Sequence, residues 1–191
     1  MLVFEVSAVI LICVQLVIMT NNRQNRADKK DNKEYKNKTR LVMIFLQFAS
    51  IILAFLSIPN NIWRIGHLQI SIAYNVIGIC LLFLGLSIRI FSMNKLGKYY
   101  STLLFTNEDH KLITTGIYKY IRHPIYLGDM LFYFGIGISL SNYIIILVLL
   151  LSSSTAYIIR MNQEEKMMIE GFGNEYVVYC SKTKRLIPFL Y

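Results

Sequence analysis

Long apolar runs separated by shorter polar stretches organise this chain. The runs cover residues 1–19, 41–58, 72–91 and 127–159. A helix of about 20 apolar residues is long enough to cross the hydrocarbon core of a bilayer. The pattern therefore predicts an all-α integral membrane protein, with its polar stretches as loops outside the lipid.

The last apolar run, residues 127–159, is too long for one upright span. As a single helix it would extend about 50 Å at about 1.5 Å per residue, whereas the hydrocarbon core is about 30 Å thick. Ser141-Asn142 near its middle is an adjacent polar pair with turn character. We therefore predict two short helices in a hairpin, which gives five spans in total, with a single tilted span as the alternative.

The positions of the basic residues favour five spans. The loop over residues 21–40 holds eight Lys and Arg residues, whereas the loop over 59–71 holds only Arg64. The stretches 92–126 and 160–191 are again rich in Lys and Arg. Five spans put the three basic stretches on one face, and basic loops remain in the cytoplasm. The N-terminus is then outside and the C-terminus is cytoplasmic. If the source is prokaryotic, the membrane is the cell membrane.

The same pattern divides a single membrane domain into four parts. In chain order, these parts are three spans with a basic loop, a cytoplasmic connector, a helical hairpin and a cytoplasmic tail. Their predicted boundaries are residues 1–91, 92–126, 127–159 and 160–191.

Composition excludes several classes of function. The chain is 55% hydrophobic and 16% charged, with a net charge of +9. No basic stripe interleaved with aromatic residues is present, so we expect no nucleic-acid partner. The three cysteines form no Cys-x-x-Cys pair, and the histidines lack metal-ligand spacing, so we expect no disulfide framework and no metal site.

Arg160 and Glu164 are the first candidates for chemistry. They are four residues apart, which places them on one face of a helix, directly after the last apolar run. Two interpretations remain open: an intrahelical ion pair, or two charged side chains that point into a polar cavity at the membrane boundary. Glu165 is expected to face another direction.

A second candidate is Arg122-His123-Pro124. Proline is well tolerated at the start of a helix, so Pro124 is expected to begin one. The segment is either a simple helix start with an interfacial arginine, or a device that presents His123 and Tyr126 to a ligand. Tyrosines at a bilayer boundary are often only an interfacial belt.

Several of these segments together resemble one family. Leu112-Ile113-Thr114-Thr115-Gly116-Ile117-Tyr118 and Arg122-His123-Pro124-Ile125-Tyr126-Leu127-Gly128 resemble the isoprenylcysteine carboxyl methyltransferases. So do Arg160, Glu164-Glu165, Phe172-Gly173-Asn174-Glu175-Tyr176 and Arg185-Leu186-Ile187-Pro188, in the same order. The resemblance covers about half of the chain, and the short length is typical of prokaryotic members.

The resemblance implies S-adenosylmethionine as methyl donor, S-adenosylhomocysteine as product, and a prenylated cysteine carboxylate as acceptor. A lipid-modified acceptor and membrane lipid are then the expected partners. The connector and the C-terminal helix would meet to form a cofactor pocket that is not a Rossmann fold. The implied cofactor contacts are His110, Lys111, Leu112, Ile113, Tyr118, His123, Pro124, Ile125, Tyr126 and Glu164.

The resemblance also assigns catalytic roles to two arginines. Arg160 would bind the acceptor carboxylate. Arg122 would orient the acceptor or, alternatively, anchor to phosphate headgroups. A phospholipid N-methyltransferase acting on phosphatidylethanolamine is the main alternative function, but its amine acceptor gives Arg160 no obvious purpose. A membrane sterol reductase and a structural membrane subunit are the less favoured alternatives.

Overall fold

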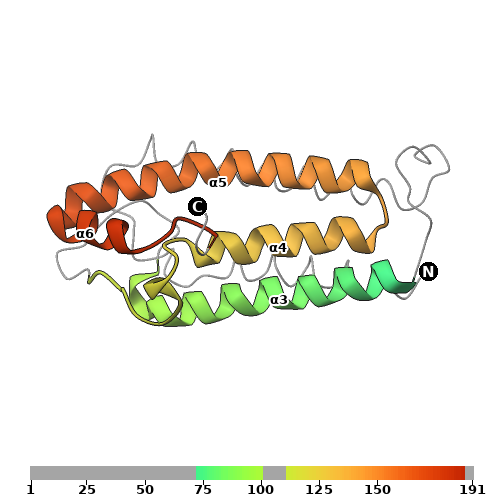
Figure 1. The fold of residues 1–191 in the computed structure, drawn as a ribbon, viewed down its shortest axis with the longest axis horizontal. Coiled ribbons are helices and arrows are strands. Elements are labelled where there is room, and N and C mark those ends of the chain that lie inside the picture. Colours follow the sequence, from blue (N-terminus) through green and yellow to red (C-terminus); the bar gives the residue numbers. More distant parts are fainter. Residues whose placement is uncertain (1–71, 101–110, 188–191) are drawn as a thin grey trace.

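The computed structural model describes residues 72–100 and 111–187. The first two predicted spans, the basic loop between them and His110 lie outside these residues. Within the described part, the regular elements are helical, apart from an isolated β-bridge between Ile121 and Lys184. Three long helices run side by side, with a short fourth helix at one end (Figure 1).

The first described helix, α3 (Ile72–Leu96), covers the third predicted span and extends beyond Phe91. Residues 92–96 are more polar but contain no Gly or Pro, so the helix continues until Gly97. Gly97 has φ +54°, a left-handed conformation that commonly ends helices. The 3₁₀ turn Gly97–Tyr99 then leads into the connector.

Helices α3 and α4 (Pro124–Ser139) pack through glycines. A Cβ atom at Gly85 would lie 2.4 Å from the Gly128 carbonyl oxygen, and one at Gly135 would lie 2.7 Å from the Gly78 carbonyl oxygen. The two contacting glycines of each helix are seven residues apart, so they repeat on one face. Small residues of this kind let helix backbones approach closely inside a membrane.

The predicted hairpin is confirmed. Helix α4 ends at Ser139 and α5 (Tyr143–Phe172) begins four residues later. Asn142 caps α5, because its side-chain oxygen accepts hydrogen bonds from the backbone N–H groups of Ile144 and Ile145 at 3.0 and 3.2 Å. Ser141 makes the reversal with φ 51°.

The second arm of the hairpin and the helix expected over the polar residues after it form one continuous helix. Helix α5 continues through the predicted boundary at Ile159 as far as Phe172, because residues 160–170 are polar but contain neither Gly nor Pro. Gly173, with φ +55°, separates it from α6 (Asn174–Lys182). The polar end of α5 is therefore a rigid extension of the apolar helix.

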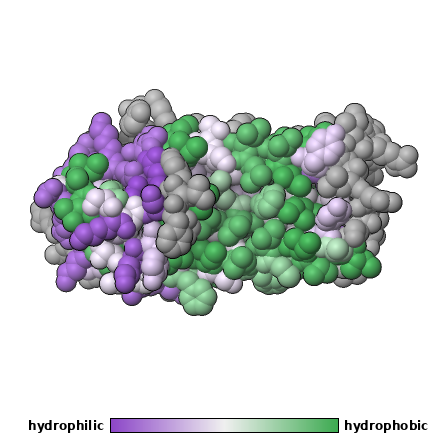
Figure 2. All heavy atoms as spheres, in the orientation of Figure 1, coloured by the Kyte–Doolittle hydropathy of each residue, from purple (hydrophilic) through white to green (hydrophobic). Residues whose placement is uncertain are grey.

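The described helices have strongly apolar outer surfaces. α3 and α5 are each long and apolar enough to cross a membrane, whereas α4 has 16 residues. Figure 2 shows the apolar surface over the middle of the helices and the hydrophilic residues gathered at the end that carries α6. Large side chains exposed along α3 and α5 include Ile77, Phe83, Leu84, Phe91, Leu147, Leu151 and Ile159.

The connector and the tail meet at the hydrophilic end, as expected. The backbone N–H of Arg122 donates to the Lys184 carbonyl at 2.8 Å, and that of Lys184 donates to the Tyr120 carbonyl at 3.0 Å. The N–H of His123 donates to the Arg185 carbonyl at 3.1 Å. These bonds fix the residues just before α4 against the residues after α6.

Candidate functional site

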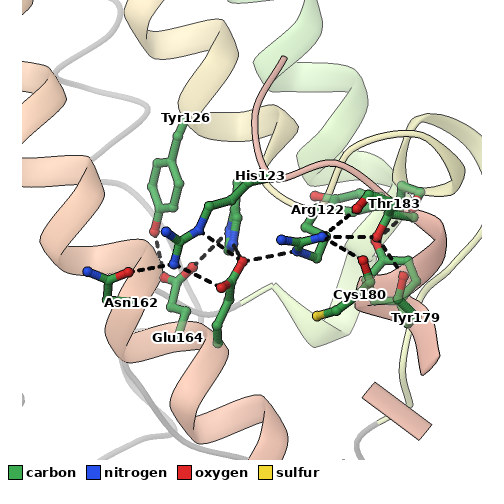
Figure 3. Close-up of polar contacts among 11 residues, drawn as sticks. Arg122, His123, Tyr126, Asn162, Glu164, Tyr179, Cys180 and Thr183 are labelled. Carbon is green, nitrogen blue, oxygen red and sulfur yellow. Dashed lines mark hydrogen bonds and ion pairs between the residues drawn. The ribbon is translucent and has the colours of Figure 1, made fainter. Parts of the chain in front are cut away.

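Glu164 is the centre of a polar cluster at the polar end of the bundle. Its Oε1 accepts a hydrogen bond from Arg160 Nε at 2.9 Å and another from the Tyr126 hydroxyl at 2.5 Å. Its Oε2 lies 3.6 Å from His123 Nδ1. Figure 3 shows His123 and Tyr126 reaching from the start of α4 toward Glu164 on α5.

Local sequence explains why these side chains converge. Arg160 and Glu164 are one helical turn apart in α5, so their side chains meet on one face. Pro124 occupies the first turn of α4, and His123 is the residue before the helix. Tyr126 follows three positions later, and its ring stacks with the imidazole at a centroid distance of 5.7 Å. Proline thus presents both side chains to α5.

The Arg160–Glu164 ion pair is present, and it is not a solvated surface pair. The ion pair forms within the helix, and it is also enclosed: the Arg160 side chain is 5% exposed and that of Glu164 is 23% exposed. An enclosed ion pair that two side chains of another helix contact differs from a solvated surface pair. The arrangement places opposite charges side by side at the edge of an apolar bundle.

Glu165 is the centre of a second cluster, with arginine partners other than that of Glu164. His123 Nε2 lies 3.1 Å from its Oε1. Arg122 Nε donates to the same oxygen at 3.0 Å, and the Arg185 guanidinium donates to both carboxylate oxygens at 3.2 and 2.8 Å. Glu165 therefore joins the connector, α5 and the tail.

The surroundings of Glu165 keep it ionised. It lies on the polar extension of α5, beyond the apolar part of the helix. Burial alone would raise the pKa of this carboxyl, but the hydrogen bonds from His123 and Arg122, followed by that from Arg185, lower its pKa to about 2. An ionised acceptor of several hydrogen bonds is suited to hold segments together and not to transfer protons.

Arg122 is engaged with α5 and the tail through two nitrogens of its guanidinium. Besides Glu165, it donates to the carbonyl of Thr183 at 2.5 Å and to the carbonyl of Cys180 at 3.1 Å. Figure 3 shows the side chain directed away from Tyr126 and Glu164, toward α6. These contacts make Arg122 a brace between the start of α4 and the tail.

A third polar cluster, which the sequence analysis missed, lies among the helices. The Arg89 guanidinium on α3 donates to both carboxylate oxygens of Asp129 on α4, and the Tyr157 hydroxyl on α5 donates to the second of them. Ionisable residues inside apolar segments are usually paired. Arg89 and Asp129 each lie in or beside an apolar run of the sequence, and that signal would have suggested the pair.

Tyr100, also missed from sequence, lies near both the Glu164 cluster and this third cluster. It interacts electrostatically with Arg89 and Asp129 and also with Glu164 and Arg160. Burial raises the pKa of its hydroxyl, so the group is protonated at neutral pH. It follows the 3₁₀ turn after α3, where the connector begins.

The other predicted site residues occupy the connector and the first turn of α4. Tyr118 is buried, and its hydroxyl donates to the Ser92 carbonyl at 3.3 Å, while its own carbonyl accepts from Tyr179 at 2.7 Å. Pro124 is buried and Ile125 half-buried beside His123. Lys111 is exposed, whereas Leu112 and Ile113 are half-buried.

Comparison with known proteins points in one direction. Residues 76–170 match the isoprenylcysteine carboxyl methyltransferase (ICMT) family. The protein-S-isoprenylcysteine O-methyltransferase of Saccharomyces cerevisiae is 35% identical over 125 residues, which are 60% of this chain and 49% of the yeast protein. That of Schizosaccharomyces pombe is 31% identical over 119 residues, 61% of this chain and 50% of the relative.

The fold agrees with this match. The solved structure of the eukaryotic intramembrane Ras methyltransferase ICMT superposes with a TM-score of 0.58 at 24% identity, covering 82% of this chain and 54% of that one. The chain spans about half the length of these relatives. The matched segment contains Arg89, Arg122, His123, Arg160 and Glu164, and on this evidence the chain belongs to the isoprenylcysteine carboxyl methyltransferase family.

Proposed function

We propose that this protein transfers a methyl group from S-adenosylmethionine to the carboxylate of a prenylated cysteine or a similar lipid-linked acid. The observation that carries the proposal is the enclosed Arg160–Glu164 pair, which His123 and Tyr126 contact at the polar end of an apolar bundle. The family match and the names of the relatives support the same reaction.

The charges of the pair suit the charges of the two substrates. The donor carries a cationic amino group and a sulfonium, which a carboxylate attracts. The acceptor is an anion, which an arginine binds through charge-assisted hydrogen bonds. Glu164 and Arg160 are adjacent, so ligands bound to each would have their reacting groups close together. The amine of phosphatidylethanolamine would make no use of the arginine, which could contact only the phosphate of that lipid.

The residues present fit such a donor. Glu164 offers a carboxylate, and Tyr126 and His123 offer stacked rings beside it. We assign donor contacts to His123, Pro124, Ile125, Tyr126 and Glu164, with Tyr118 and the connector residues His110, Lys111, Leu112 and Ile113. When bound, S-adenosylmethionine supplies a methyl group already activated by positive charge on sulfur.

The reaction requires little of the protein beyond binding and placement. A carboxylate is ionised at neutral pH, so no general base is needed. Arg160 would orient the acceptor oxygen, and the surrounding apolar helices would exclude water. Arg122 is already bound to the tail, so we assign it the role of a positioning residue in place of the acceptor contact or headgroup anchor expected from sequence.

The orientation in the membrane follows from the charges. Lys and Arg are frequent in the connector and the tail, which lie together at the hydrophilic end of the bundle. The positive-inside rule places that end in the cytoplasm. With five spans, the N-terminus would lie outside and the protein would be a multi-pass membrane enzyme.

The test is methyl transfer from labelled donor to a panel of acceptors: farnesylcysteine analogues, fatty acids and phosphatidylethanolamine. We expect label on the farnesylcysteine analogue in a base-labile form, as a methyl ester. Label on phosphatidylethanolamine alone would refute the carboxyl assignment and favour the N-methyltransferase.

A matched pair of variants sharpens this test. Arg160→Gln removes the proposed acceptor contact, and Lys166→Gln removes one positive charge from an exposed position on the same helix. We expect Arg160→Gln to abolish methyl-ester formation and Lys166→Gln to retain it. Equal activity of the two variants would show that Arg160 does not bind the acceptor.

A further inference from the structure

The buried cluster of Arg89, Asp129 and Tyr157 joins three helices. Each residue comes from a different helix of the bundle, and they are 4%, 2% and 1% exposed, respectively. Asp129 accepts from the Arg89 guanidinium and, at 3.1 Å, from the Tyr157 hydroxyl. Its carboxylate thus holds the tip of the Tyr157 ring in place.

The Tyr157 ring in turn touches the proposed donor site. It stacks on Tyr126 at a centroid distance of 4.8 Å and an interplanar angle of 25°. Tyr126 donates its hydroxyl hydrogen bond to Glu164. A continuous series of contacts therefore runs from Arg89 through Asp129, Tyr157 and Tyr126 to Glu164.

We propose that Arg89, Asp129 and Tyr157 are positioning residues that hold Tyr126 and Glu164 in the orientation that binds the donor. A tyrosine ring turns about two side-chain torsions, and a hydrogen bond at its tip together with a stacked neighbour fixes both. Without Asp129, Tyr157 would lose the carboxylate that accepts from its hydroxyl and would keep its hydrogen bond with Tyr133. Tyr126 would then lose the fixed orientation of its stacking partner. That the ligand is the methyl donor rests on the proposed function.

A purely structural ion pair would behave differently. Removing one member of a buried pair leaves an uncompensated charge and destabilises the fold strongly, whereas replacing both members with apolar residues of similar size is often neutral or stabilising. Such a replacement restores stability without restoring the carboxylate that accepts from the Tyr157 hydroxyl. Stability and donor binding are therefore separable.

The first experiment removes only the hydroxyl. Tyr157→Phe keeps the ring, the stack and the Arg89–Asp129 pair. Affinity for S-adenosylhomocysteine, measured by calorimetry, is expected to fall about three- to tenfold, the effect of one net hydrogen bond. Ser153→Ala is the matched control, because Ser153 is buried one turn earlier on α5 and its hydroxyl donates to Leu149 in its own helix. The control should bind like the wild type.

The second experiment compares Asp129→Leu with the double variant Arg89→Met/Asp129→Leu. We expect the single variant to unfold at a lower temperature in detergent. The double variant should recover its unfolding temperature but keep the weakened binding. Full recovery of both properties would overturn the proposal and leave the cluster with a structural role only.

A third measurement does not depend on the ligand. Fluorotyrosine placed at position 126 reports the environment of that ring by ¹⁹F NMR. Its resonance should shift or broaden in Tyr157→Phe and stay unchanged in Ser153→Ala. An unchanged resonance in Tyr157→Phe would refute the positioning role. A wild-type protein that binds no S-adenosylhomocysteine but shows the ¹⁹F change would refute the proposed function alone.

Discussion

Glu164 and Glu165 are consecutive residues of α5, and both of their carboxylates face the imidazole of His123. Nδ1 lies 3.6 Å from Glu164, and Nε2 lies 3.1 Å from Glu165. Consecutive helical side chains diverge by about 100°, so the bridging ring must come from outside the helix. His123 can supply this ring because it directly precedes α4. It thereby connects the Glu164 cluster to the Glu165 cluster.

Glu164 and Arg160 should separate donor binding from acceptor binding. Glu164→Ala removes the proposed partner of the donor's amino group, and calorimetry with S-adenosylhomocysteine should show an affinity loss on the order of 10- to 100-fold. Arg160→Ala should still bind S-adenosylhomocysteine but should lose methyl transfer to the acceptor. Loss of binding in Arg160→Ala together with normal binding in Glu164→Ala would reverse the assignment.

Glu165→Gln should loosen the tail. The neutral amide cannot satisfy the guanidinium groups of Arg122 and Arg185, whose charge-assisted bonds to Glu165 have lengths of 2.8–3.2 Å. We expect a stability loss of about 1.5–3 kcal/mol and faster amide hydrogen exchange at residues 183–187. Glu170→Gln, at an exposed position on the same helix, is the control and should change neither property.

The contribution of Glu165 should also depend on pH. Its pKa falls from 4.5 to about 2 on folding, so its stabilisation is fully present above about pH 4.5 and is lost as the pH falls toward 2. The difference in unfolding temperature between wild type and Glu165→Gln should be constant near neutrality and shrink over that acid range. A difference that persists at pH 2 would contradict the assigned cause.

Gly85→Ala should disrupt the packing of α3 on α4. The new Cβ atom would lie 2.4 Å from the Gly128 carbonyl oxygen and 2.6 Å from the Phe132 nitrogen, and both are backbone atoms. We expect a destabilisation of at least about 1–3 kcal/mol, the range for overpacked cores. Cys80→Ala, at an exposed position on α3, is the control. If Gly85→Ala and Cys80→Ala unfolded at the same temperature in detergent, the close backbone contact of α3 and α4 would be contradicted.

Asn142→Ala should weaken the start of α5. The side-chain oxygen of Asn142 caps the N–H groups of Ile144 and Ile145, and alanine leaves both without that acceptor. Loss of such a cap costs about 1 kcal/mol. The unfolding temperature of Asn142→Ala should fall accordingly. Asn142→Asp should keep most of the wild-type stability, because aspartate caps helices equally well.

Hydrophobic patterning predicted the helical segments better than their ends. The turn at Ser141-Asn142 was predictable because a polar pair interrupts a run that is too long for one span. A helix from Arg160 onward was also expected, but its continuity with the apolar helix was not, because the run from Arg160 to Glu170 changes in polarity and not in helix propensity. Helix length follows backbone propensity, whereas the apolar run reports only the part suited to lipid.

The candidate site was predictable where motifs are local. The i, i+4 spacing brought Arg160 to Glu164, and Pro124 set the start of α4. The partners of Glu165 and the Asp129 cluster were missed because their members lie far apart in the sequence. Arg89 and Asp129 are 40 residues apart, and only packing of α3 on α4 makes them neighbours.

The contact between Gly85 and Gly128 limits how an acceptor arrives. With backbone atoms of α3 and α4 this close, a hydrocarbon chain has no room to slip between the two helices. The prenyl group of the proposed acceptor would therefore have to reach Arg160 from another side of the bundle. Two residues without side chains thereby close one route to the site before any charged group takes part in recognition.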